Sequence, residues 1–280
     1  MKIGRFSLGA DDAFWGVLSP DESSVQRIKT PFAQWAPVLA WATDAPDDVL
    51  GDVMPIDGLT VRAPVETGGR IFGVGMNYVA HLERLGSKAP KSLAAYIKPD
   101  SAVVDPFGEI RYPSTTAQFD YEVELVVVVA KPIEEGRPNL ECLLGYTAGN
   151  DASPRDVERQ TGGADLYSMK GQDQTAPIGP WVGSVGEFGG TSQPALTIRA
   201  SVNGEMRQED KTTQMIFDLD HILGYVNTRN RLRAGDVIFT GTTCGVGLED
   251  GRMLQPGDVV EVGIAEIGFC RNVVGEKRPA

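Results

Sequence analysis

Three carboxylate side chains in this sequence have the residue types and spacing needed to hold a hard metal ion. Glu122 and Glu124 are alternate residues in a β-branched run, Tyr121 to Val129. In a β-strand, side chains two residues apart point to the same side, so these two carboxylates can converge. Asp151, in the turn Gly149 to Pro154, can supply a third oxygen. Such an oxygen triad suits Mg²⁺ or Mn²⁺ and leaves positions open for substrate or water.

The same acidic pattern is also typical of a strand edge that faces solvent, because charged side chains are mostly exposed. On spacing alone, the metal site and the exposed edge are equally good interpretations. The residues that follow, Leu125 to Val129, are all apolar and favour a buried strand. A buried strand would not tolerate two unpaired carboxylates, so the apolar neighbours favour the metal site.

The composition limits the partners and the kind of metal site. The 280 residues contain 38 Asp and Glu against 26 Lys and Arg, a net charge of −12. Such a surface repels phosphates and anionic lipids, so neither nucleic acid nor a membrane is an expected partner. Two histidines, His81 and His221, and three scattered cysteines argue against a zinc site. The few cysteines and the lack of an apolar leader or long apolar stretch predict a cytoplasmic protein.

The elements that must position these residues are mostly strands. We expect a strand over residues 121–129, helices around 32–41 and over 213–226, and a short helix starting over 156–160. The Pro- and Gly-bearing run 62–69 is typical of a domain boundary. We therefore predict a mixed α+β, β-rich chain with a small N-terminal accessory domain, residues 1–65, and a larger second domain, residues 66–280.

Four motifs follow one another along the chain: IFGVGMNYVAH at 71–81, DYEVEL at 120–125, GYTAGNDASPRD at 145–156 and GDVIFTGT at 235–242. Their order is similar to that in the fumarylacetoacetate hydrolase family, and several motifs in order are far more specific than one. The resemblance covers roughly residues 71–274. It implies a β-roll catalytic domain, a homodimer, a 2-oxo or diketo acid substrate, and Mg²⁺, Mn²⁺ or Ca²⁺ held by Glu122, Glu124 and Asp151.

The resemblance also implies roles for residues outside the triad. His81 is the expected general base. Arg84 stands three residues later, where similar hydrolases carry the carboxylate that orients the histidine, so Glu83 is the expected substitute. Lys170 is expected to contact the substrate or a developing oxyanion, and Arg155 to pair with a substrate carboxylate or with Asp156. The expected substrate-binding residues are Arg155, Gln172, Thr242, Gly241 and Tyr78.

The run K-G-Q-D after Lys170 departs from the family's K-S-F-D, so Gln172 is expected to read a more polar substrate. The expected activity is hydrolysis of a C–C bond in a 2,4-diketo acid, such as an acylpyruvate or a fumarylacetoacetate-like compound, by water that His81 activates. Decarboxylation of an oxaloacetate-type β-keto acid, and isomerisation or hydration of a 2-oxo-enoate, are alternatives on the same metal site. A protein that binds a 2-oxo acid without catalysis is a third.

Overall fold

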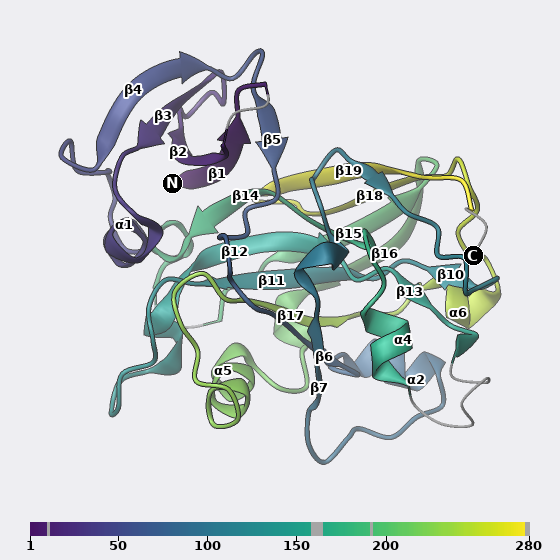
Figure 1. Cartoon of the computed structure of the whole chain (residues 1–280). Coiled ribbons are helices and arrows are strands. Elements are labelled where there is room, and N and C mark those ends of the chain that lie inside the picture. Colours follow the sequence, from purple (N-terminus) through teal and green to yellow (C-terminus); the bar gives the residue numbers. More distant parts are fainter. Residues whose placement is uncertain (10–11, 158–164, 191–192, 278–280) are drawn as a thin grey trace.

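The computed structural model describes residues 1–9, 12–157, 165–190 and 193–277, and it is β-rich with short helices, as the sequence predicts (Figure 1). Its largest sheet has the strand order β4 (Leu50–Pro55), β3 (Ser24–Ile28), β2 (Phe14–Leu18), β1 (Lys2–Ser7), β14 (Ala176–Ser184), β12 (Leu143–Asn150), β11 (Val123–Val129), β17 (Val237–Thr242), β6 (Ile71–Gly75) and β7 (Ala94–Lys98). Two further strands join this sheet, β5 (Thr60–Arg62) beside β1 and β8 (Val103–Val104) beside β14.

A second sheet packs against the first. It has the order β16 (Glu205–Lys211), β15 (Thr197–Val202), β18 (Val259–Ile264), β19 (Gly268–Val274) and β9 (Glu109–Ile110). A short pair, β10 (Phe119–Asp120) and β13 (Ser153–Pro154), completes the strands. The helices are α1 (Phe32–Leu39), α2 (Val79–Arg84), α4 (Leu166–Lys170), α5 (Leu219–Asn227) and α6 (Gly247–Asp250), with single 3₁₀ turns at Asp100–Ala102, Asn139–Cys142, Val185–Phe188 and Thr212–Gln214.

Two of the predicted helices are present with shifted ends. The helix expected around 32–41 is α1, and the one expected over 213–226 begins only at Leu219. The Asp218 side chain accepts a hydrogen bond from the His221 amide at 2.8 Å, which caps the first turn and sets this start. Residues 158–160 of the short helix expected over 156–160 lie outside the described residues. No helix of the described chain is long and apolar enough to cross a bilayer.

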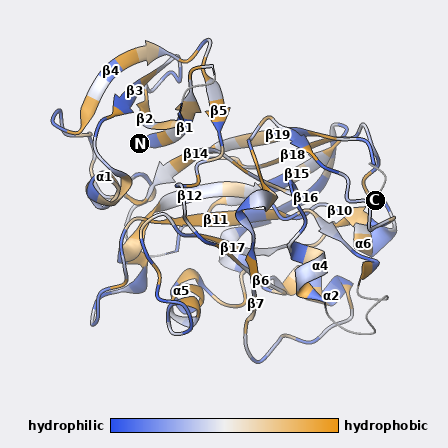
Figure 2. Ribbon diagram, in the orientation of Figure 1, coloured by the Kyte–Doolittle hydropathy of each residue, from blue (hydrophilic) through white to orange (hydrophobic). Residues whose placement is uncertain are grey.

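Strand β11 lies at the centre of the fold and is covered on both faces. Its odd-numbered residues, Val123 to Val129, belong to a core shared with β15 and β18. Val126 and Val128, on the other face, belong to a second core that includes Trp35 of α1 and Ile178 of β14. A strand buried on both sides needs an almost unbroken apolar run, and β11 is coloured largely orange in Figure 2.

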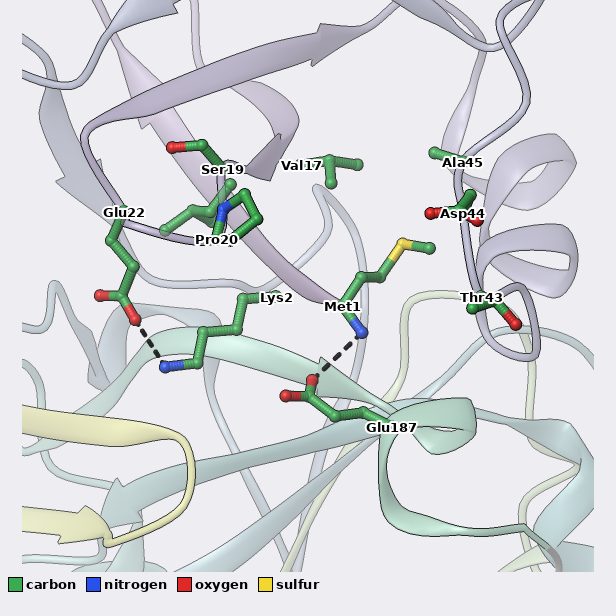
Figure 3. A pocket seen from close by; sticks show the side chains of 11 residues that line it. Met1, Lys2, Val17, Ser19, Pro20, Glu22, Thr43, Asp44, Ala45 and Glu187 are labelled. Atoms are coloured by element: carbon green, nitrogen blue, oxygen red, sulfur yellow. Dashed lines mark hydrogen bonds and ion pairs between the residues drawn. The ribbon is translucent and has the colours of Figure 1, made fainter.

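Residues 1–65 form strands β1 to β5 and helix α1, but their sheet continues into the rest of the chain. Ile3 of β1 pairs with Val182 of β14. The Met1 amine lies 3.1 Å from the Glu187 carboxylate, beside a cavity of about 460 Å³ at this junction (Figure 3). One continuous sheet thus crosses the boundary predicted at residue 65. The division into two domains stays a prediction.

Candidate functional site

The three acidic residues of the predicted triad meet where strands β11 and β12 come together. Val123 pairs with Asn150, so the start of β11 lies beside the end of β12, and the Asp151 amide donates to the Glu122 carbonyl oxygen at 2.9 Å. One carboxylate oxygen each of Glu122, Glu124 and Asp151 lies within 4.8 Å of the others. All three are buried, at 5%, 1% and 0% exposure, so the solvent-facing strand edge is the wrong interpretation.

Two buried lysines contact this cluster. The Lys170 ammonium donates to Glu122 at 2.6 Å and to Asp151 at 2.7 Å. Lys98, of β7, donates to the other oxygen of Asp151 at 2.6 Å, and the Tyr96 hydroxyl also donates to Asp151. A buried charge needs such partners, so Asp151 is held from three sides.

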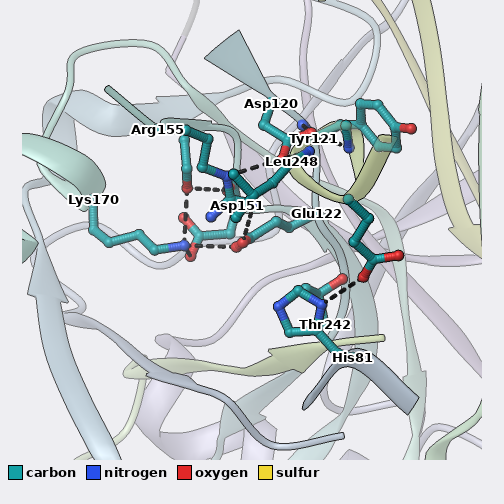
Figure 4. Close-up of polar contacts among 12 residues, drawn as sticks. His81, Asp120, Tyr121, Glu122, Asp151, Arg155, Lys170, Thr242 and Leu248 are labelled. Carbon is teal, nitrogen blue, oxygen red and sulfur yellow. Dashed lines mark hydrogen bonds and ion pairs between the residues drawn. The ribbon is translucent and has the colours of Figure 1, made fainter. Parts of the chain in front are cut away.

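Arg155 completes the cationic side of the cluster. Its guanidinium donates to Asp120 at 2.9 Å and to Glu122 at 2.5 Å. It does not pair with Asp156, which instead accepts hydrogen bonds from the Thr116 hydroxyl and the Ala117 amide. Figure 4 shows Arg155, Lys170 and Asp151 gathered around Glu122, with His81 and Thr242 to one side.

Glu124 differs from the other two acids because no Lys or Arg among the described residues forms an ion pair with it. Burial and the charges of Asp151 and Glu122 raise its pKa well above the ordinary value. Burial also disfavours the charged form of Glu122, but Arg155 and Lys170 outweigh it and lower the pKa of that carboxyl. The Glu124 carboxylate accepts a hydrogen bond from the Gly241 amide at 2.6 Å.

These residues fit a hard divalent cation. Three buried carboxylates converge, and one of them has charged neighbours of its own sign and no cationic partner in the described chain. A cation among them would favour the ionised form of all three, and oxygen donors are those that Mg²⁺ and Mn²⁺ prefer.

His81 lies in helix α2 and pairs with an acid that the sequence did not suggest. Its Nδ1 is 2.9 Å from Glu249 Oε1, and the other oxygen of Glu249 accepts from the Gly245 amide at 2.8 Å. Glu83 is exposed, because residues two apart on a helix do not share a face. The structure therefore brings Glu249, and not the predicted Glu83, to the imidazole.

A cavity of about 460 Å³ opens above the carboxylate cluster. Of the predicted site residues, it is lined by His81, Glu122, Glu124, Arg155, Lys170 and Thr242. Its other lining residues are Gly75, Met76, Leu85, Ala94, Tyr96, Leu166, Met169 and Leu248.

Besides the exposed Glu83, four predicted site residues do not line the cavity. Asp151 is fully buried beneath the cavity, and Gly241 acts through its amide on Glu124. Tyr78 is completely buried, and burial raises the pKa of its hydroxyl well above the ordinary value. The Gln172 side chain donates to the Ser168 carbonyl oxygen at 2.7 Å and does not line the cavity, so the prediction that it reads a polar substrate finds no support.

Gln208 is a further residue that the sequence did not reveal. From β16 of the second sheet, its side chain accepts from the Val123 amide at 3.0 Å and donates to the Thr242 hydroxyl at 3.0 Å and the Thr243 carbonyl at 2.8 Å. It thereby fixes the backbone between Glu122 and Glu124. Like Glu249, it comes from a distant segment, so no local spacing could have identified it.

The fold and the buried carboxylate cluster define a protein of the fumarylacetoacetate hydrolase type. Residues 70–275 match the fumarylacetoacetate (FAA) hydrolase C-terminal family, and the chain belongs to the fumarylacetoacetate hydrolase family.

Three relatives illustrate the activities named within this family. The human protein named oxaloacetate tautomerase FAHD2A, mitochondrial, is 32% identical over 226 residues, which cover 79% of this chain and 71% of that one. The solved structure of fumarylacetoacetate hydrolase from Exiguobacterium antarcticum is 30% identical, with a TM-score of 0.79 and 98% and 99% coverage of the two chains. A 5-carboxymethyl-2-hydroxymuconate delta-isomerase from Mycobacterium smegmatis is 27% identical, with the same TM-score and coverage.

Proposed function

We propose that this protein is a divalent-metal-dependent enzyme that hydrolyses the C–C bond of a 2,4-diketo acid, such as an acylpyruvate. The observation that carries the proposal is the contact of His81 with Glu249 at 2.9 Å, because His81 lines the same cavity as Glu122 and Glu124. A carboxylate can only accept, so the His81 Nδ1 carries the proton and the other ring nitrogen, Nε2, is free to take one. An oriented imidazole is the base that hydrolysis requires.

Mg²⁺ or Mn²⁺ on Glu122, Glu124 and Asp151 would supply Lewis-acid polarisation of the 2-oxo group. His81 Nε2 takes a proton from the water whose oxygen bonds to the C4 carbonyl carbon, and Glu249 stabilises the imidazolium. The C3–C4 bond breaks, and its electron pair goes to C3, which receives the proton from His81. One water is consumed, and the products are a carboxylic acid and a 2-oxo acid. Lys170 lies close enough to the cluster to stabilise an oxyanion there.

A second candidate is keto–enol tautomerisation of an oxaloacetate-type acid on the same site. The names of the human relative and of the M. smegmatis isomerase favour it. Here His81 would move a proton between C3 and an oxygen, without a water molecule bonding to carbon. The homodimer, the cytoplasmic location and the use of Mg²⁺, Mn²⁺ or Ca²⁺ stay predictions, and the human relative's name places that protein in mitochondria.

Product analysis separates the candidates. With Mg²⁺ or Mn²⁺, we expect acetylpyruvate to give pyruvate and acetate in equal amounts, and His81→Ala to slow this roughly 100-fold or more while metal affinity is kept. Glu124→Ala should abolish the metal-dependent activity. Loss of the enol absorbance of oxaloacetate, without acetate formation from acetylpyruvate, would contradict hydrolysis and support tautomerisation. Release of CO₂ would indicate a decarboxylase. Binding of oxalate with no turnover of any of these acids would indicate a binding protein.

A further inference from the structure

Apolar side chains surround the opening of the cavity whose floor holds the carboxylates. Met76, Leu85 and Leu248 line this opening and are 39%, 36% and 39% exposed, while Met169 lies deeper at 8%. They come from four separate segments: the end of β6, helix α2 with the residue after it, helix α6 and helix α4. Large apolar side chains that converge from separate segments on one cavity mark a binding surface.

The backbone at Met76 adds an independent observation. Met76 has φ +58°, the left-handed conformation that is unfavourable for a residue with a side chain and that glycine adopts freely. The neighbouring Asn77 is fully buried and holds this turn, since its side chain donates to the Thr240 carbonyl at 2.8 Å and accepts from the Phe217 amide at 2.8 Å. A methionine in a position suited to glycine indicates that its side chain has a use in the cavity that it lines.

Leu248 is placed by the same residues that organise the catalytic groups. Its amide donates to Asp120 at 3.0 Å, the carboxylate that also binds Arg155, and the next residue is Glu249, the partner of His81 (Figure 4). Helix α6 therefore carries the apolar Leu248 and the carboxylate partner of His81, Glu249, at consecutive positions.

The cations that line the cavity already have acidic partners. Arg155 contacts Asp120 and Glu122, and Lys170 contacts Glu122 and Asp151. Within the described part of the chain, the lining thus offers no cation to a second carboxylate at the outer end of a substrate. Burying an unpaired carboxylate against methionine and leucine side chains is unfavourable.

We propose that Met76, Leu85, Met169 and Leu248 form an apolar subsite for the acyl group of the substrate. The substrate is then a 2-oxo acid whose far end is an uncharged hydrocarbon chain, and not a second carboxylate. This inference rests on the proposed function, because it places the 2-oxo acid end of the molecule at the carboxylate cluster.

Binding of simple 2-oxo acids tests the subsite without turnover. With Mg²⁺ present, calorimetry should give Kd values that fall about fourfold for each methylene group added from pyruvate through 2-oxobutanoate and 2-oxopentanoate to 2-oxohexanoate. The dicarboxylate 2-oxoglutarate should bind at least about tenfold more weakly than 2-oxopentanoate, which has the same number of carbons. Equal or tighter binding of 2-oxoglutarate, or no dependence on chain length, would overturn the subsite and leave the proposed function standing. If pyruvate and 2-oxohexanoate both fail to bind with Mg²⁺, the proposed function falls and the subsite with it.

Three variants test whether Met76 and Leu248 form the apolar subsite. Met76→Gly suits the backbone at that position, so the protein should fold, and 2-oxohexanoate should bind about tenfold more weakly while the Kd of pyruvate stays within about twofold. Leu248→Lys supplies a cation and should reverse the preference, so that 2-oxoglutarate binds more tightly than 2-oxopentanoate. Met206→Ala, on β16 and 53% exposed, is the matched control and should change neither value. Unchanged affinities in both Met76→Gly and Leu248→Lys would refute the assignment.

Discussion

Replacing Glu249 with glutamine tests whether its charge assists His81. The two side chains are 9% and 8% exposed, and the contact between them measures 2.9 Å. As the imidazole takes a proton, the carboxylate stabilises the new positive charge through a charge-assisted hydrogen bond worth about 1.5–3 kcal/mol. Glutamine keeps the size and an acceptor oxygen but lacks the charge. Since about 1.4 kcal/mol corresponds to a factor of ten in rate, kcat should fall about 10- to 150-fold.

Steady-state kinetics with acetylpyruvate and Mg²⁺ measure this effect, and calorimetry measures Mg²⁺ affinity, which should be unchanged because Glu249 does not contact the triad. The control is Glu83→Gln, which removes the same charge from an exposed residue two positions after His81. Its kcat should stay within about twofold of the unmodified protein. The reasoning is refuted if Glu83→Gln slows the reaction as much as Glu249→Gln does, or if Glu249→Gln leaves kcat unchanged.

Three further changes probe the metal cluster, a backbone position and a buried thiol. Glu124→Gln removes a carboxylate whose pKa burial and its acidic neighbours raise, so the metal-free protein should be no less stable, while the Tm increase on adding Mg²⁺ should vanish in calorimetric scans. A persisting Mg²⁺-dependent increase would contradict the assignment. Gly241→Ala should destabilise the fold by about 1–3 kcal/mol in urea titrations, since its Cβ would lie 2.8 Å from that of Asn77 at φ +97°; an unchanged midpoint would be inconsistent with this contact. Burial raises the pKa of Cys142 to about 12. The contribution of the protonated thiol to the free energy of unfolding is therefore complete below the pKa of an unfolded cysteine, about 8.5, and is lost as the pH rises from there towards 12. Cys142→Ala should therefore make the fall in unfolding free energy above that pH shallower, by up to about 1.4 kcal/mol per pH unit, whereas identical slopes would show that the thiol does not titrate as described.

The centre of the fold could be predicted because the necessary information is local. The β-branched run 121–129 predicts a strand whatever surrounds it, and the pleat places Glu122 and Glu124 on one side, although the observed strand starts only at Val123. The position of Asp151 depends on the pairing of β11 with β12, which the sequence does not show, so the sequence offers Asp151 only as a carboxylate in a nearby turn.

The remaining site residues depend on long-range packing. Glu249 lies 168 positions from His81 along the chain, and Gln208 reaches the site from another sheet. Glu83 was the nearest acid in sequence, but the helical turn at His81 directs it outward. The sequence suggests Asp156 or a substrate as the partner of Arg155, because Asp120 comes near it only through the pairing of β10 with β13.

The pairing of β1 with β14 makes the first strand a cover for an aggregation-prone edge. Lys2 and Ile3 pair with Gly183 and Val182, and the Phe6 and Trp181 rings pack with centroids 5.7 Å apart. A polypeptide truncated at the family boundary would leave that stretch of β14 with unpaired amides and carbonyls and an uncovered indole, and such edges recruit strands from other molecules. We therefore expect the segment that matches the family to need residues outside it for solubility, and a gene fragment encoding that segment alone should yield insoluble protein.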